Sequence, residues 1–160
     1  MSTTTDGRSA RWEVHRQQRR KELVKVLHKL AFNPGDGKLR AQLTEAADVI
    51  GRIRAAHELA KTRKRANVQA IIDAYAAERF WGVREQMVTA LADAQTALAL
   101  EGLRHIVQTE KDPLVLGRVF RSAAKFRDAS LAAAVRARIE AGGLAPCATH
   151  AAWLAVGAQR

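Results

Sequence analysis

Val49-Ile50-Gly51-Arg52 opens a pattern that returns as Trp81-Gly82-Val83-Arg84 and as Leu114-Val115-Leu116-Gly117. A fainter fourth copy ends at Val156, 33 residues beyond the apolar anchor of the third copy. The anchors of the first three copies follow one another every 32 residues, at Leu59, Leu91 and Ala123. A period of this length is typical of stacked helix pairs, in which each pair buries its apolar face only against its neighbours. The repeat therefore predicts an all-α stack, which offers surfaces rather than a reaction chamber.

Turn and cap signals divide the repeat region into eight predicted helical segments. The clearest turn is Asn-Pro-Gly-Asp-Gly at 33–37. Asp48, Asp112 and Asp128 are candidate N-caps, and Pro113 suits the first helical position after Asp112. Gly142-Gly143 is a candidate helix end. Taken in pairs, the predicted segments are 38–46 with 49–62, 67–78 with 81–93, 96–110 with 113–125, and 129–141 with 147–157.

Apolar residues at helical spacing mark the predicted core of these pairs. They form one stripe on each helix of the second and third pairs, which we interpret as packing surfaces and not as a cofactor site. The stripes are Ile71, Ile72 and Tyr75; Val83, Met87, Val88 and Leu91; Leu98, Leu103, Ile106 and Val107; and Val115, Val119 and Ala123.

The composition fits one helical domain. The chain has 160 residues, of which 48% are hydrophobic and 5% aromatic, with only three prolines. No apolar stretch approaches the roughly 18 residues that a membrane span needs, and the polar start of the chain does not resemble a signal peptide. With Cys147 as the single cysteine, no disulfide can form within the chain. These features predict a cytoplasmic protein.

Positive charge is concentrated in the first part of the chain. The formal net charge is +11, and residues 1–65 hold 16 Lys and Arg against 7 Asp and Glu. Such a patch attracts phosphate backbones, acidic proteins or anionic lipid headgroups, although it is also what a solvated arginine-rich helix surface looks like. The candidate partner-binding or phosphate-binding residues are Arg16, Arg19, Arg20, Lys61, Arg63, Lys64 and Arg65.

Two further stretches resemble a known family. The run from Ala47 to Lys61, Ala-Asp-Val-Ile-Gly-Arg-Ile-Arg-Ala-Ala-His-Glu-Leu-Ala-Lys, and Phe-Trp-Gly-Val-Arg at 80–84 are similar to the C-terminal helical-repeat region of aminopeptidase N-type zinc aminopeptidases. The resemblance covers about residues 24–158. It departs at Leu116, where a repeat arginine is expected, and at the basic front end, where the family has a β-sandwich.

The resemblance implies a right-handed α-solenoid of about four HEAT-like helical hairpins. In front of it, the helical spacing of Leu23, Leu27 and Leu30 predicts a basic N-terminal helix. The predicted divisions are a disordered tail at 1–7, a basic helix and turn at 8–37, and the helical-repeat domain at 38–158. The family has a strand near the start of this region, so whether 20–32 is helix or strand stays open.

The chemistry of a zinc peptidase is missing from the chain. Zinc peptidases of this family carry His-Glu-x-x-His on a helix, with two imidazoles as metal ligands and the glutamate as general base. His57-Glu58 begins that string, but Lys61 stands at the fifth position and would repel the cation. Cys147 and His150 have ligand spacing without a second pair, and we expect Cys147 to be a buried, inert thiol. The sequence therefore predicts a non-enzymatic protein without metal or cofactor.

Three residues at the repeat junctions have two interpretations each. Arg52 and Arg84 recur at equivalent positions, where they either form a ladder with acidic neighbours or contact a partner. Trp81 either packs in a seam, which Phe80 and Val83 favour, or stands exposed as an anchor.

The predicted function is that of a non-catalytic scaffold that holds a protein or peptide partner. One alternative is nucleic-acid binding to the phosphate backbone through the basic N-terminal third. Another is a truncated peptidase remnant without an independent role. The partner, the face that is used and the oligomeric state are not predicted.

Overall fold

A computed structural model describes residues 16–19 and 35–158, and within these ranges it contains helices and no strand. Residues 16–19 are helical with exposed side chains, and they belong to a different unit (residues 1–34) from the rest (residues 35–160). The predicted tail at 1–7, most of the predicted basic helix and the open question at 20–32 lie outside the described residues. The all-α prediction is confirmed for the residues described.

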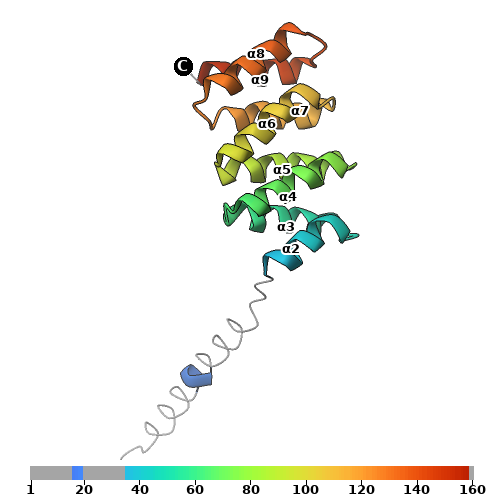
Figure 1. Cartoon of the computed structure of the whole chain (residues 1–160), viewed down its shortest axis with the longest axis vertical. Coiled ribbons are helices and arrows are strands. Elements are labelled where there is room, and N and C mark those ends of the chain that lie inside the picture. Colours follow the sequence, from blue (N-terminus) through green and yellow to red (C-terminus); the bar gives the residue numbers. More distant parts are fainter. Residues whose placement is uncertain (1–15, 20–34, 159–160) are drawn as a thin grey trace, which may run out of the picture. The chain divides into compact units, whose positions relative to one another are not determined.

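Residues 35–158 form helices α2 to α9 (Figure 1). Each predicted segment corresponds to one of these helices, and no predicted end differs from the observed end by more than two residues. The helices are α2 Asp36–Glu45, α3 Val49–Lys61, α4 Arg65–Ala77, α5 Trp81–Ala94, α6 Ala97–Thr109, α7 Pro113–Ala123, α8 Ala129–Glu140 and α9 Pro146–Ala158.

The predicted turn at 33–37 is wrong at its second half, because α2 already begins at Asp36. The backbone N–H groups of Lys38 and Leu39 both donate to the carbonyl of Gly35, which closes the first helical turn there. The Asp36 carboxylate lies in that first turn, where the positive end of the helix dipole favours it.

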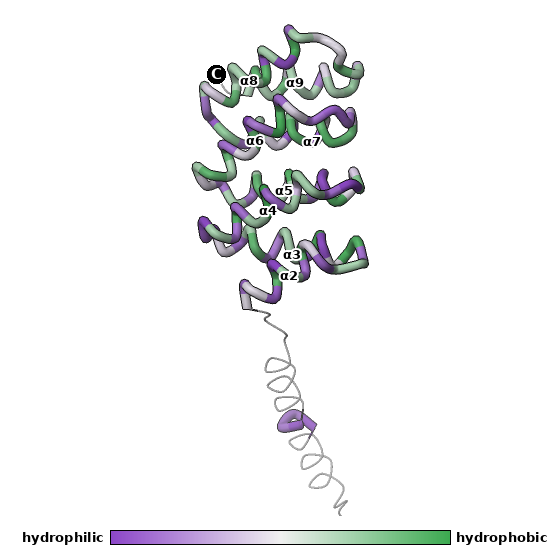
Figure 2. Tube along the Cα trace, turned by 45° about the vertical axis from the view of Figure 1, so that its right-hand side comes forward, coloured by the Kyte–Doolittle hydropathy of each residue, from purple (hydrophilic) through white to green (hydrophobic). Residues whose placement is uncertain are grey.

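The helices form two layers. One layer stacks α3, α5, α7 and α9 side by side, and the other stacks α2, α4, α6 and α8, with each even-numbered helix packed on the odd-numbered helix that follows it. The pairs follow one another in chain order from α2 to α9 (Figure 1). Figure 2 shows apolar and polar residues interspersed along most of the helices, and the buried residues of the stack are almost all apolar.

The core runs between the layers along the whole stack. The stripe on α5 is fully buried at Val83, Met87, Val88 and Leu91 because α3, α7, α4 and α6 surround this helix. Burying one such side chain stabilises the fold by about 1.5–3 kcal/mol. Removing a pair would therefore expose core on both sides of the cut, as expected for a repeat stack.

Aspartate caps set the starts of several helices. Asp48, Asp112 and Asp128 each accept a backbone N–H from the first turn of the helix that follows, as their positions predict. Thr96 caps α6 in the same way, and α5 begins after Phe80 without a side-chain cap. None of the described helices combines the length and apolar character that a bilayer span requires.

Candidate functional site

The first turns of α3, α5 and α7 lie along one edge of the stack. Arg52, in the first turn of α3, is paired with Glu78, which comes just before α5. Arg84, in the first turn of α5, lies 3.7 Å from Glu110, which comes just before α7. The loops before α5 and α7 are thus tied to the helix one repeat earlier.

The Arg52–Glu78 pair also organises the loop between α4 and α5. Glu78 Oε2 accepts from Arg52 Nε at 2.8 Å, while Oε1 accepts the backbone N–H groups of Arg79 at 3.0 Å and Phe80 at 2.9 Å. Arg52 Nη1 donates to the carbonyl of Ala46 at 2.8 Å. One arginine therefore joins the loop before α3 to the loop before α5.

The same arrangement recurs one repeat later around Glu110. Its Oε1 accepts the backbone N–H groups of Lys111 and Asp112, each at 2.8 Å, and Arg84 Nη2 lies 3.6 Å from the Asp112 carboxylate. The hydroxyl of Tyr75 donates to Glu110 Oε2. Burial, the hydrogen bond to Glu110 and the negative charge of Glu110 raise the pKa of Tyr75 well above its ordinary value.

A third pair would need an arginine at 116 and an acid at 142, one repeat beyond Arg84 and Glu110. The chain has Leu116 and Gly142 there, so both partners are absent together. Leu116 is buried, and Gly142 has a φ of 72° in the loop after α8. The chain therefore lacks both the arginine and the acidic residue that a third Arg–Glu pair would need.

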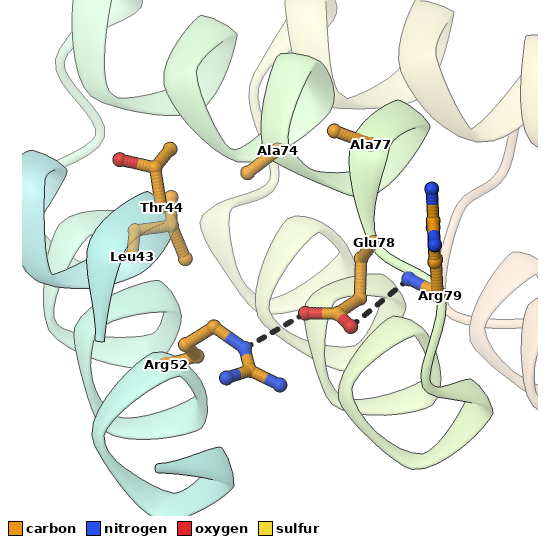
Figure 3. Close-up of a pocket in the computed structure, with 7 residues that line it drawn as sticks. All are labelled: Leu43, Thr44, Arg52, Ala74, Ala77, Glu78 and Arg79. Carbon is orange, nitrogen blue, oxygen red and sulfur yellow. Dashed lines mark hydrogen bonds and ion pairs between the residues drawn. The ribbon is translucent and has the colours of Figure 1, made fainter. Parts of the chain in front are cut away.

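A pocket of about 290 Å³ lies beside the first pair, between the end of α2, the start of α3 and the end of α4. Arg52 points toward the Glu78 carboxylate at one side of it, and Arg79 stands on the far side of Glu78 (Figure 3). One repeat later, the buried ring of Tyr75 takes the position of Leu43, which lines this pocket. The lining residues are Leu43, Thr44, Arg52, Ala74, Ala77, Glu78 and Arg79.

Large apolar side chains stand in solvent along this same edge. Ile50 is in the first turn of α3, Phe80 and Trp81 begin α5, and Leu114 is in the first turn of α7; their exposed fractions run from 41% for Trp81 to 76% for Ile50. The rings of Phe80 and Trp81 rest on each other with centroids 5.7 Å apart. We call Ile50, Phe80, Trp81 and Leu114 the apolar edge.

The preference for a packed Trp81 is wrong. Trp81 is the first residue of α5, and its side chain leaves the helix toward solvent while Val83 takes the buried position. A Cβ on Gly82 would come within 2.8 Å of the Phe80 ring, so the glycine lets that ring lie close to the helix start. Phe80 therefore packs on Trp81 and the start of α5 rather than in the seam.

Two exposed cations flank the apolar edge at equivalent positions. Arg79 and Lys111 are 32 residues apart, each directly after the glutamate of an Arg–Glu pair. The nearby acids Asp112 and Asp48 are engaged as helix caps. The edge thus combines apolar side chains with positive charge.

The basic candidates fall into two groups. The first group lies from the last residue of α3 to the first residue of α4. There, Lys61 pairs with Glu58 at 2.6 Å and Lys64 with Asp36 at 2.7 Å, while Arg63 and Arg65 are exposed. The Lys64 ammonium, together with Asn67, holds the pKa of Asp36 below its usual range. The second group, Arg16 and Arg19, is exposed on the helical residues 16–19, and Arg20 lies outside the described residues.

The expected burial of Cys147 is wrong, because the thiol is exposed at the start of α9. α9 is the last helix of its layer among residues 35–158, and only its inner face is covered, by α7 and α8. His57, in the string that resembles a zinc motif, lies on α3 with Nε2 3.3 Å from Gln86 Oε1. The side chains of the described residues bring no three His, Cys, Asp or Glu together as a metal site.

Two ion pairs between successive repeats were not predicted from the sequence. Arg118 Nη2 lies 2.6 Å from Glu85 Oε1, and Lys125 Nζ lies 2.8 Å from Asp93 Oδ1. Each pair joins residues that are 33 or 32 positions apart. Oppositely charged residues spaced by one repeat in the sequence could therefore have indicated these pairs.

Comparison with known proteins adds no relative. No family model, no curated protein and no solved structure matches the chain. The resemblance to the aminopeptidase repeat region stays a prediction, and the residues of the apolar edge carry the functional inference.

Proposed function

We propose that this chain is a non-catalytic helical-repeat scaffold that binds an extended peptide segment of a partner protein along the apolar edge. The observation that carries the proposal is the repetition of exposed apolar side chains in three successive repeats. Ile50 and Leu114 are two repeats apart, and Trp81 with Phe80 stands between them. Exposed aromatic and apolar residues that gather in one place are typical of protein-binding surfaces.

The loops that carry this edge are held before any partner arrives. The Arg52–Glu78 and Arg84–Glu110 pairs tie the loops before α5 and α7 to the preceding repeat. A surface that is already ordered loses less entropy on binding than a flexible one, which favours affinity.

The geometry of the stack sets the pattern of the peptide. Neighbouring helices in a layer lie roughly 8–10 Å apart, and a peptide in the extended polyproline II conformation advances about 3.1 Å per residue with three residues per turn, so every third side chain lies on the same face. Each repeat therefore corresponds to about three residues of peptide. Because Arg79 and Lys111 flank the edge, the partner segment should carry apolar side chains at every third position with acidic residues between them.

Selection of peptides from a random library on the immobilised full chain tests this proposal. We expect the selected peptides to share apolar residues at positions i, i+3 and i+6 together with acidic residues. In fluorescence polarisation, Trp81→Ser should weaken a selected peptide at least tenfold. The matched control is Trp153→Ser, which removes an exposed tryptophan from α9 and should change the affinity less than twofold.

The proposal fails if the library yields no shared pattern, or if Trp153→Ser weakens the peptide as much as Trp81→Ser does. Circular dichroism of both variants shows whether they remain folded. Since both side chains are exposed, we expect the helical spectrum to be unchanged.

We further propose that α2 to α9 form a right-handed, HEAT-like solenoid of the kind found at the C-terminus of aminopeptidase N-type enzymes. The 32-residue interval, the two layers and the recurring Arg–Glu pairs support this assignment. An experimental structure in which successive pairs progress with the opposite hand would contradict it.

A further inference from the structure

We propose that two copies of this chain associate through the outward faces of their α9 helices. Within residues 35–158, α9 contacts α7 and α8 on one side and no helix on the other. Its buried side is small and apolar, consisting of Ala148, Ala151, Ala152, Ala155 and Val156. The opposite side carries the exposed residues Cys147, His150, Trp153 and Leu154.

The repeat register shows that Trp153 stands at a position that the stack otherwise covers. Val156 corresponds to Ala123 in the preceding repeat, so Trp153 corresponds to Phe120 of α7. Phe120 is 0% exposed, whereas Trp153 is 57% exposed. The buried Gly117 of α7 likewise corresponds to the exposed His150. Among residues 35–158, the side of α7 that packs under the next repeat is therefore present on α9 without a covering helix.

The charge of α9 indicates what covers that surface. Pro146–Ala158 contains no Asp, Glu, Lys or Arg, whereas each of the helices α2 to α8 contains at least one. A charged helix placed against Trp153 and Leu154 would lose hydration without gaining a counter-charge, which is costly. A second α9 face buries no formal charge at neutral pH, and a two-fold axis makes the same patch serve on both sides.

The contact should be weak and should strengthen with salt. A helix of 13 residues is about 20 Å long, so a single pair of helices covers less area than a standard protein interface. Each copy carries a net charge of +11, and this repulsion is screened as the ionic strength rises. We therefore expect a micromolar dimer that is tighter at 500 mM than at 100 mM NaCl, the opposite of phosphate binding.

Sedimentation velocity of the full chain over about 5–500 µM tests the inference. We expect a shift from monomer to dimer with concentration, and Trp153→Lys should weaken the dimer at least tenfold by adding charge at the centre of the face. The matched control is Trp81→Lys, which places the same substitution on the apolar edge and should leave the dimer constant unchanged.

A monomer at all concentrations would overturn the inference, as would a dimer that Trp153→Lys leaves intact or Trp81→Lys disrupts. Should Trp153→Lys lose its helical circular dichroism, Leu154→Lys takes its place, since Leu154 is also exposed on this face. The apolar edge and the outward face of α9 are different surfaces. The peptide-binding proposal and the dimer proposal can therefore be contradicted independently of each other.

Discussion

Glu110 is a glutamate whose side chain is almost completely buried at the end of a helix, and it brings several backbone and side-chain donors together. The Tyr75 hydroxyl, two backbone N–H groups of the following loop and the nearby Arg84 guanidinium all face its carboxylate. The sequence predicted an acidic neighbour for Arg84 as one of two possibilities, but it did not identify Glu110. A glutamate before a loop is most often solvated, and only the fold shows that Tyr75 covers this one.

Tyr75→Phe should reduce the free energy of unfolding by about 1–3 kcal/mol, because the buried Glu110 carboxylate loses a hydrogen bond. Urea denaturation followed by circular dichroism measures this change. As a control, Thr44→Val removes an exposed hydroxyl that donates only to carbonyls of its own helix, and it should change stability by less than about 0.5 kcal/mol. Equal effects of the two substitutions would show that Tyr75 contributes only its ring.

Tyr75 should lose its proton only at a higher pH than an ordinary tyrosine, because its pKa is raised in the folded chain. Its contribution to stability is fully present below the ordinary tyrosine pKa of about 10 and decreases as the pH rises above it, by up to about 1.4 kcal/mol per pH unit. Tyr75 is the only tyrosine, so absorbance at 295 nm reports it alone. We expect tyrosinate to appear only as the helices unfold, and Tyr75→Phe to remove part of the alkaline loss of stability.

At the scale of the helices, the sequence predicted starts and ends well because caps and turns are local. Three helix starts are each marked by one capping side chain, those of Asp48, Asp112 and Asp128. The errors occur where tertiary context decides. Trp81 looked like a seam residue beside Phe80 and Val83, yet its position at the first residue of α5 turns it to solvent. Cys147 looked buried because the sequence does not show which side of α9 lacks a neighbour.

The Arg52–Glu78 pair should be worth about 1–2 kcal/mol in a double-mutant cycle of Arg52→Ala and Glu78→Ala, because both side chains are largely buried and share further hydrogen bonds. Chemical denaturation of the four proteins gives the coupling energy. The control cycle uses Lys61 and Glu58, an exposed pair within α3, for which we expect less than about 0.5 kcal/mol. A coupling no larger than the control would contradict the role assigned to the Arg–Glu pairs.

At the scale of the whole molecule, the period of 32 residues was enough to predict helix pairs that stack in chain order, since each pair needs its neighbours to bury its apolar side. The binding surface was not predictable in the same way. Ile50 and Leu114 became candidates only when the structure placed them in solvent at equivalent first turns. The basic residues stood out in the sequence, but pairing of Lys61 and Lys64 with carboxylates leaves less free charge than the composition suggests.

The positive charge of the chain predicts weak, salt-sensitive binding to duplex DNA. We expect this binding to fall steeply between 50 and 200 mM NaCl. The double variant Arg63→Gln, Arg65→Gln should weaken it without changing peptide affinity, since Arg63 lies in the turn before α4 and Arg65 is the first residue of α4, away from the apolar edge. Electrophoretic mobility shift and fluorescence polarisation measure the two. Tight DNA binding that persists at 200 mM NaCl would instead favour the nucleic-acid alternative.

The loop between α8 and α9 differs from the two loops that the Arg–Glu pairs secure. It contains Gly142 and Gly143, both with a φ of 72°, and Leu116 cannot hold it as Arg52 and Arg84 hold theirs. The last helix pair is therefore expected to fray first, so backbone amides of α9 should take up deuterium before those of α5. If a second copy covers α9, this uptake should slow as the protein concentration rises, and fraying and assembly would then oppose each other at the same end of the stack.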